Sequence, residues 1–191
     1  MTLVDKPLSA LLEDFRSPAP TPGGGSASAI AGALGASLLA MVAGLAKPRA
    51  VSHDDVQKLR EGGDRCAGFA RRLEALVDAD SDAYSEVVAA YRLPKAGDAE
   101  KSVRTVRIQE ALKAATEAPL EVMRLCSAAM ADADLVRELG NANASSDVGV
   151  AIELLRAGRR GARLNVEINL DSVNDQAYAT AVRDEIARLE G

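Results

Sequence analysis

Apolar residues recur at steps of three and four along nearly the whole chain, which is the spacing of one face of an α-helix. The first such segment is short, and its apolar face consists of Leu8, Leu11, Leu12 and Phe15. Prolines at positions 18, 20 and 22 stop this helix and impose an extended connector. A second helix is expected over about residues 26–46, where Lys47-Pro48 ends it.

Two long helices are expected in the middle of the chain. Ser52 and Asp55 stand three residues apart, as a weaker form of the capping box, and open a third helix that reaches about Tyr91. The turn "LPKAGD" breaks the helical pattern after it. Asp98 then caps a fourth helix, which continues past Pro119 with an expected kink.

The last third of the chain is also helical by its spacing. The stretch "LGNANASSD" is a loop or a helix start, a fifth helix follows over about residues 146–161, and a last helix covers about residues 174–189. Between them "LNVEINL" alternates like a strand, but one strand makes no sheet, so we expect an extended or helical connector. Residues 1–191 are therefore predicted to form a single all-α domain, an antiparallel helical bundle.

Composition excludes several classes of protein. Aromatic residues make up 3% of the chain and Trp is absent, so large surfaces for stacking nucleobases are not expected. With a net charge of −5 the chain lacks the basic face that a nucleic-acid binder needs. Cys66 and Cys126 make no disulfide framework, and the first residues lack a basic segment followed by an apolar one. We therefore expect a reduced, cytoplasmic protein.

Residues 17–46 contain no charged side chain, and three explanations compete. A Walker-type phosphate loop needs Lys followed by Ser or Thr after its last glycine, whereas Ser26-Ala27 follows here. A membrane span is long enough, but Gly, Ala and Ser fill it, without an aromatic belt or a flanking basic cluster. A buried helix remains, either for packing alone or with Gly23, Gly24 and Gly25 leaving the N–H groups of the helix N-terminus free to hold an anion or a ligand carbonyl.

The third helix places an acid in its apolar face. That face consists of Cys66, Phe69, Leu73, Val77, Asp80, Tyr84, Val87 and Tyr91. A carboxylate in this position must be paired, hydrogen-bonded or protonated, because an unpaired buried charge costs several kcal/mol. Asp78 and Asp82 turn away from this face and should be solvated. Asp80 is either a core acid satisfied by a facing helix, or a carboxylate with a shifted pKa that is suited to proton transfer.

A second polar group precedes the fifth helix. Asp147 lies one turn before the apolar stripe of that helix, and Asn141 and Asn143 stand just upstream. Asp147 is either an early-turn acid favoured by the helix dipole or, with the two amides, one rim of a polar pocket. Basic side chains after the third helix, Lys95 and Arg104 among them, form a solvated face or hold the anionic tail of a small ligand.

The sequence has few residues for histidine or cysteine chemistry. His53 is the only histidine and stands at a predicted helix start, so a histidine-based triad and a multi-histidine zinc site are excluded. The two cysteines lack metal-ligand spacing, and we expect neither a metal nor a nucleotide cofactor. If the chain is an enzyme, it works with carboxylates and water.

Five segments resemble, in order, the successive blocks of the cyclodeaminase/cyclohydrolase family. They are "SPAPTPGGGSASAIAGALGASLLAMVAGL", "DSDAYSEVVAAYRLPK", "EKSVRTVRIQEALKAATEAPL", "GNANASSDVGVA" and "LNVEINL". The family includes bacterial methenyltetrahydrofolate cyclohydrolase and the C-terminal domain of formiminotransferase-cyclodeaminase. The resemblance covers about residues 8–170 and implies an all-helical homodimer.

This resemblance implies an enzyme of folate one-carbon metabolism. The expected activity is hydrolysis of 5,10-methenyltetrahydrofolate to 10-formyltetrahydrofolate, with the folate as substrate and no other cofactor. The alternatives are a formiminotetrahydrofolate cyclodeaminase, which releases ammonia, and a non-catalytic folate-binding helical dimer. The expected partners are a small-molecule folate and a second copy of the chain, with no nucleic acid and no membrane.

The family's functional residues match particular positions of this sequence. Its acid matches Asp80, which the resemblance assigns as the catalytic acid/base. Asn143 and Asp147 would orient the pterin or the water, and Lys95 or Arg104 would hold the glutamate tail. The full set expected to bind substrate is Gly24, Gly25, Ser26, Lys95, Arg104, Asn141, Asn143 and Asp147.

Overall fold

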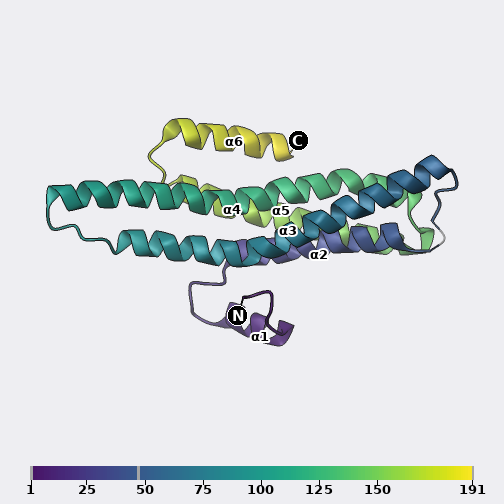
Figure 1. Cartoon of the computed structure of the whole chain (residues 1–191), viewed down its shortest axis with the longest axis horizontal. Coiled ribbons are helices and arrows are strands. Elements are labelled where there is room, and N and C mark those ends of the chain that lie inside the picture. The colour runs from purple at the N-terminus through teal and green to yellow at the C-terminus, as the bar shows by residue number, and fades with distance from the viewer. Residues whose placement is uncertain (1, 47, 191) are drawn as a thin grey trace.

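A computed structural model describes residues 2–46 and 48–190. In these residues the chain forms helices and no strand, which confirms the all-α prediction. The helices are α1 (Leu8–Arg16), α2 (Gly24–Gly44), α3 (His53–Tyr91), α4 (Asp98–Leu139), the short 3₁₀ helix η1 (Ala142–Ala144), α5 (Ser145–Leu170) and α6 (Gln176–Glu190). Figure 1 shows α2 to α5 as an elongated bundle, with α1 and α6 outside it on opposite sides.

Helix α2 lies against α3, α4 and α5, and its small residues let these helices approach closely. A Cβ atom added to Gly32 would lie 2.7 Å from Sγ of Cys126 in α4, and one added to Gly35 would lie 2.7 Å from the carbonyl oxygen of Ala151 in α5. By length and composition alone α2 could cross a membrane, but here it packs against α3, α4 and α5. The uncharged segment is therefore a closely packed helix.

One predicted helix is confirmed and another is corrected. Helix α4 runs from Asp98 to Leu139 and continues past Pro119, as predicted. The prediction that the fifth helix ends near residue 161 is wrong, because α5 continues through "LNVEINL" to Leu170. The physical reason is that Ala162, Val166 and Leu170 are buried at steps of four, so the segment continues one helical face although its sequence also alternates.

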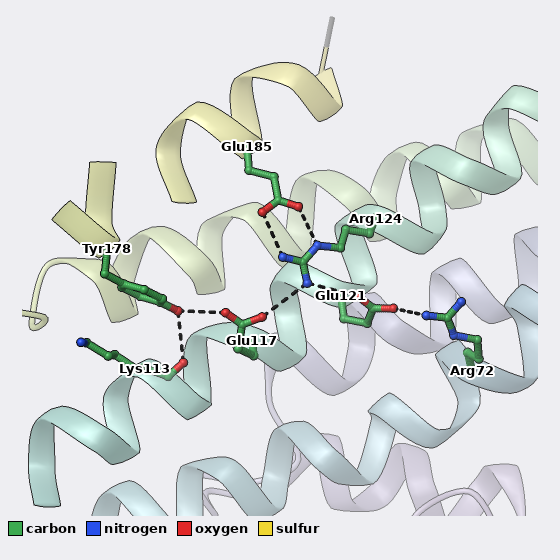
Figure 2. A network of polar contacts seen from close by, with 7 residues as sticks. All are labelled: Arg72, Lys113, Glu117, Glu121, Arg124, Tyr178 and Glu185. Atoms are coloured by element: carbon green, nitrogen blue, oxygen red, sulfur yellow. Dashed lines mark hydrogen bonds and ion pairs between the residues drawn. The ribbon is translucent and has the colours of Figure 1, made fainter. Parts of the chain in front are cut away.

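Helix α6 buries Ala179, Val182 and Ile186 in the core and is also joined to α4 by polar and charged groups (Figure 2). The guanidinium of Arg124 donates from Nε and Nη2 to the two carboxylate oxygens of Glu185, at 2.6 and 2.9 Å. Its Nη1 donates to Glu121 at 3.2 Å, and the hydroxyl of Tyr178 donates to Glu117 at 3.1 Å. The hydrogen bonds from Arg124 hold the pKa of the Glu185 carboxyl below its usual range.

Candidate functional site

A cleft of about 420 Å³ opens where the start of α2 meets the second half of α3, the first half of α4 and the end of α5. The residues that line it are Pro20, Thr21, Gly23, Gly24, Asp80, Tyr84, Val87, Tyr91, Leu112, Ala115, Asn165, Ile168, Asn169 and Ser172. Among these described residues Asp80 alone is charged near neutral pH. The cleft therefore presents one carboxylate among apolar, aromatic and amide side chains.

Asp80 is held at the N-terminus of α2 by uncharged donors. Its Oδ2 accepts a hydrogen bond from the backbone N–H of Ser26 at 3.1 Å, and lies 3.4 Å from the Ser26 hydroxyl. That hydroxyl donates to the carbonyl of Val77 at 2.8 Å. Because Gly23 at the N-cap has no side chain, Asp80 reaches across from α3 and caps α2.

Gly25 leaves the space that the Asp80 carboxylate fills. A Cβ atom at position 25 would lie 1.9 Å from Oδ1 and 2.5 Å from Oδ2 of Asp80. No side chain fits there without displacing the carboxylate. The glycine-rich start of α2 therefore provides the space that the acid in the apolar face of α3 occupies.

Burial raises the pKa of the Asp80 carboxyl, and the hydrogen bonds from Ser26 partly oppose that rise. No basic side chain lines the described cleft to stabilise the ionised form. The carboxylate is therefore a better proton acceptor than an exposed aspartate, as a general base requires.

The walls of the cleft are aromatic on one side and carry amides on the other. Tyr84 and Tyr91 come from α3, in line with Asp80. Asn165 and Asn169 come from α5, where their Nδ2 atoms donate to the carbonyls of Gly161 and Ala115, both at 2.9 Å. In the described chain neither Oδ1 of these two amides accepts a hydrogen bond, so both acceptors are available to a ligand.

Asn165 and Asn169 were missed by the sequence analysis, which treated "LNVEINL" as a connector. A signal was present, since the two residues stand four apart and share one face if the segment is helical.

Gly24, Gly25 and Ser26 lie together at this cleft. Gly24 lines the cleft, whereas Gly25 and Ser26 are buried beneath Asp80. The N–H of Ser26 is bound by Asp80, so this N–H group is not free to hold an anion. The prediction that Asp78 is solvated is wrong, because this residue is half-buried and accepts a hydrogen bond from the N–H of Leu3 at 2.6 Å.

The predicted basic residues lie near the outer end of the cleft. Arg104 donates to the carbonyl of Tyr91 at 2.9 Å, and its guanidinium lies 5.6 Å from the centroid of the Tyr91 ring. Tyr91 lines the cleft, so Arg104 stands behind that wall. Lys95 is exposed in the turn between α3 and α4 and does not line the cleft.

Asn141, Asn143 and Asp147 lie at the other end of the bundle. The Asn141 amide donates to the carbonyl of Ala46, just beyond the C-terminal end of α2, at 2.7 Å. Asp147 is in the first turn of α5, and Asn165 lies about 27 Å further along that helix at 1.5 Å per residue. Within one chain, the structure does not bring these three residues to Asp80.

In the described residues no group of three or more His, Cys, Asp or Glu side chains is placed to hold a metal ion.

Comparison with known proteins gives a consistent result. A family profile described as formiminotransferase-cyclodeaminase matches residues 7–188. A methenyltetrahydrofolate cyclohydrolase of Methylorubrum extorquens is 40% identical over 184 residues, which are 96% of this chain and 87% of that protein. A formimidoyltransferase-cyclodeaminase of Gallus gallus is 31% identical over 194 residues, 98% of this chain but only 35% of that protein.

The fold is also shared with a solved structure. The crystal structure of a formiminotetrahydrofolate cyclodeaminase from Thermotoga maritima superimposes with a TM-score of 0.85 and 25% sequence identity. The match covers 97% of this chain and 89% of that one.

Proposed function

The chain belongs to the formiminotransferase-cyclodeaminase family, and we propose that it hydrolyses 5,10-methenyltetrahydrofolate to 10-formyltetrahydrofolate. The observation that carries this proposal is the single carboxylate of Asp80 in an otherwise uncharged cleft. The Methylorubrum extorquens relative, which matches over most of both chains, bears the name of this activity.

The substrate carries a positive charge spread over the N–C–N bridge between its two rings. A carboxylate in a poorly hydrated cleft attracts such a cation more strongly than it would in water. Asp80 then accepts a proton from a water molecule as the water oxygen bonds to the bridge carbon, which gives a neutral tetrahedral adduct. The protonated Asp80 returns the proton to N5 as the bond between N5 and the bridge carbon breaks. The adduct hydroxyl loses its proton to solvent and becomes the carbonyl of the formyl group on N10.

The other lining residues fit the rest of a folate. The exposed rings of Tyr84 and Tyr91 offer flat surfaces to the pterin and benzoyl rings. Asn165 and Asn169 offer Oδ1 acceptors to the N–H groups of the pterin. Arg104, behind Tyr91, is placed to meet the glutamate carboxylates that extend beyond the cleft.

Cyclodeamination of formiminotetrahydrofolate is the second candidate. The solved structure that shares this fold bears that name. The Gallus gallus relative, of which this chain covers 35%, is named formimidoyltransferase-cyclodeaminase. In that reaction the bridge nitrogen that does not carry the formimino group attacks the formimino carbon and ammonia leaves, so Asp80 would protonate the departing amine. The same carboxylate serves either reaction.

We further propose that the protein works in the cytoplasm as a homodimer, without a metal, a nucleic acid or a membrane. The chemistry above needs only a carboxylate and water, and a broad apolar face on α2 and α5 suits a second copy.

The test is an assay of the purified protein with each substrate. Loss of the methenyltetrahydrofolate absorbance, faster than in buffer and proportional to the protein concentration, supports the cyclohydrolase. Ammonia release from formiminotetrahydrofolate without that loss transfers the proposal to the cyclodeaminase. Saturable folate binding with no turnover of either compound contradicts both activities and leaves a binding protein.

A further inference from the structure

The hydroxyl of Ser26 lies among three polar groups of α3. It donates to the carbonyl of Val77 at 2.8 Å, lies 3.4 Å from Oδ2 of Asp80, and is 3.2 Å from the Ser81 hydroxyl. Ser26 is completely buried and does not line the cleft. A ligand in the cleft is therefore influenced by this hydroxyl only through Asp80.

The N–H and the hydroxyl of Ser26 contact the same carboxylate oxygen, but they differ in freedom. The N–H is fixed in the backbone of α2 and donates to Oδ2 of Asp80. The hydroxyl carries one hydrogen, which can turn toward either of two acceptors, the carbonyl of Val77 and Oδ2. The acceptor with more negative charge holds this hydrogen, because charge-assisted hydrogen bonds are the stronger ones.

Ser81 supplies the hydrogen that the Ser26 oxygen accepts. Ser26 has a single hydroxyl hydrogen and gives it to Val77 or to Asp80, so Ser81 is the donor between the two hydroxyl oxygens. When the Ser26 hydrogen turns away from Val77, the carbonyl of Val77 keeps the N–H of Ser81 as its partner within α3. Neither position of the hydrogen leaves one of these groups unpaired.

The described surroundings of Asp80 bring no cation that competes with this hydroxyl. Residues 17–46, which include α2, have no charged side chain. The residues of α4 and α5 that line the cleft are not titratable, and they are Leu112, Ala115, Asn165, Ile168 and Asn169. The titratable groups nearby on α3 are the acids and phenols of Asp78, Asp82, Tyr84 and Tyr91. Lys6, in the segment that contacts α3 through Leu3, is paired with Asp14 at 2.6 Å.

We propose that Ser26 is a positioning residue, whose buried hydroxyl turns from the Val77 carbonyl to Oδ2 of Asp80 when the carboxyl is ionised, and turns back when the carboxyl takes a proton. Oδ1 of Asp80 accepts no hydrogen bond within the described chain, so it is the oxygen that takes the proton from water. As the proton reaches Oδ1, the negative charge on Oδ2 falls and the Ser26 hydrogen returns to Val77. Asp80 thus changes its protonation state with one hydroxyl rotation. This role rests on the proposed function of Asp80 as the proton acceptor.

The first test is the pH profile of Ser26→Ala. This variant keeps the backbone N–H but loses the hydroxyl, so the ionised carboxyl loses a donor and the acid limb of kcat/KM should move to higher pH. Below the wild-type limb, kcat/KM should fall about 3- to 10-fold. KM above the limb should be unchanged, because Ser26 does not line the cleft. An acid limb that stays in place in Ser26→Ala overturns the proposal.

Two further variants separate this role from packing. Ser28→Ala removes another buried hydroxyl of α2, one that donates to the carbonyl of Gly24 at 2.7 Å, and should leave the acid limb in place. Ser81→Ala removes the donor to Ser26 from a half-buried position, and should move the limb in the same direction but less far. An equal move in Ser28→Ala, or a larger move in Ser81→Ala than in Ser26→Ala, overturns the assignment.

A measurement without substrate keeps the role of Ser26 separate from the proposed function. In protein labelled with carbon-13 at the aspartate carboxyls, the NMR signal of Asp80 is the one that disappears in Asp80→Asn. Its titration should shift to higher pH in Ser26→Ala but not in Ser28→Ala. An unmoved titration overturns the role of Ser26 even in an active enzyme. An inactive wild type with the moved titration contradicts the proposed function and supports the pairing of Ser26 with Asp80.

Discussion

Two half-buried acids in this molecule, Asp80 and Glu185, have opposite surroundings. Glu185 shares both carboxylate oxygens with the guanidinium of Arg124, within a network of ion pairs that joins α6 to α4 (Figure 2). Asp80 accepts its hydrogen bonds from Ser26 alone, and no cation lines the described cleft around it. The pKa of Glu185 is lowered by Arg124, whereas burial raises the pKa of Asp80.

This difference separates an acid that holds structure from an acid that can do chemistry. A carboxylate locked to an arginine has little tendency to take a proton, and its contacts are already made. A carboxylate held by neutral donors in a cleft keeps its affinity for a proton and for an arriving cation. Perturbation of the two acids should therefore affect different properties of the protein.

The largest effect is expected from Asp80→Asn. The amide keeps an oxygen acceptor for the N–H of Ser26 but cannot take a proton from water, so kcat for methenyltetrahydrofolate should fall about 10²- to 10⁴-fold. The free energy of unfolding at neutral pH should be unchanged or higher. Steady-state kinetics and denaturant unfolding measure both. Asp82→Asn, an exposed acid on the same helix, is the matched control and should keep full activity. Full activity in Asp80→Asn would remove Asp80 from the mechanism.

Gly25→Ala should have the next largest effect. The new methyl group would overlap the Asp80 carboxylate, so the acid must move, and kcat should fall about 100-fold. Loss of the capping contact and local overpacking should lower the free energy of unfolding by about 1–3 kcal/mol. The control is Gly68→Ala, where a Cβ meets nothing within 4 Å in the middle of α3, and the change should raise stability by about 0.5–1 kcal/mol. If Gly25→Ala keeps wild-type kcat, the position of the carboxylate is not what the reaction requires.

The pH dependence should reveal the raised pKa of Asp80 itself. Below that pKa the general base is protonated, so kcat/KM should fall tenfold per pH unit, and this acid limb should lie above the ordinary aspartate value of about 4. A raised pKa in the folded protein also means that the contribution of Asp80 to stability is full below its unfolded pKa. That contribution is lost as the pH rises through the folded pKa. A limb at or below pH 4, or one that persists in Asp80→Asn, would assign the base elsewhere.

Much of this comparison could be predicted from the sequence. The three–four spacing predicted the helices and placed Asp80 in the apolar face of α3, because helical periodicity is local. The importance of the glycines at residues 23–25 was also recognised. The sequence did not indicate that one of them, Gly25, leaves the space for Asp80. That contact joins positions more than fifty residues apart, and no local pattern encodes it.

The remainder of the cleft could not be predicted for two physical reasons. Asn165 and Asn169 lie in a segment whose alternation fits a strand as well as a helix, and burial against α2 and α4 decides between them. Asn141, Asn143 and Asp147 were expected beside Asp80, yet α5 extends to Leu170 and separates the two groups by its own length. A sequence motif carries no information on how far its residues lie from Asp80 in the folded chain.

The smallest effect is expected from Glu185→Gln, and it should have the opposite character. The neutral amide weakens the paired hydrogen bonds with Arg124 and should lower the free energy of unfolding by about 1 kcal/mol, a modest value because both side chains are partly exposed. The lowered pKa of Glu185 means that its contribution to stability is present above its unfolded pKa and is lost as the pH falls through the folded pKa. Wild type and Glu185→Gln should therefore converge in stability at acidic pH, whereas kcat should be the same in both at neutral pH. A fall in kcat as large as that of Asp80→Asn would show that the network under α6 is part of the reaction, and the division between the two acids would fail.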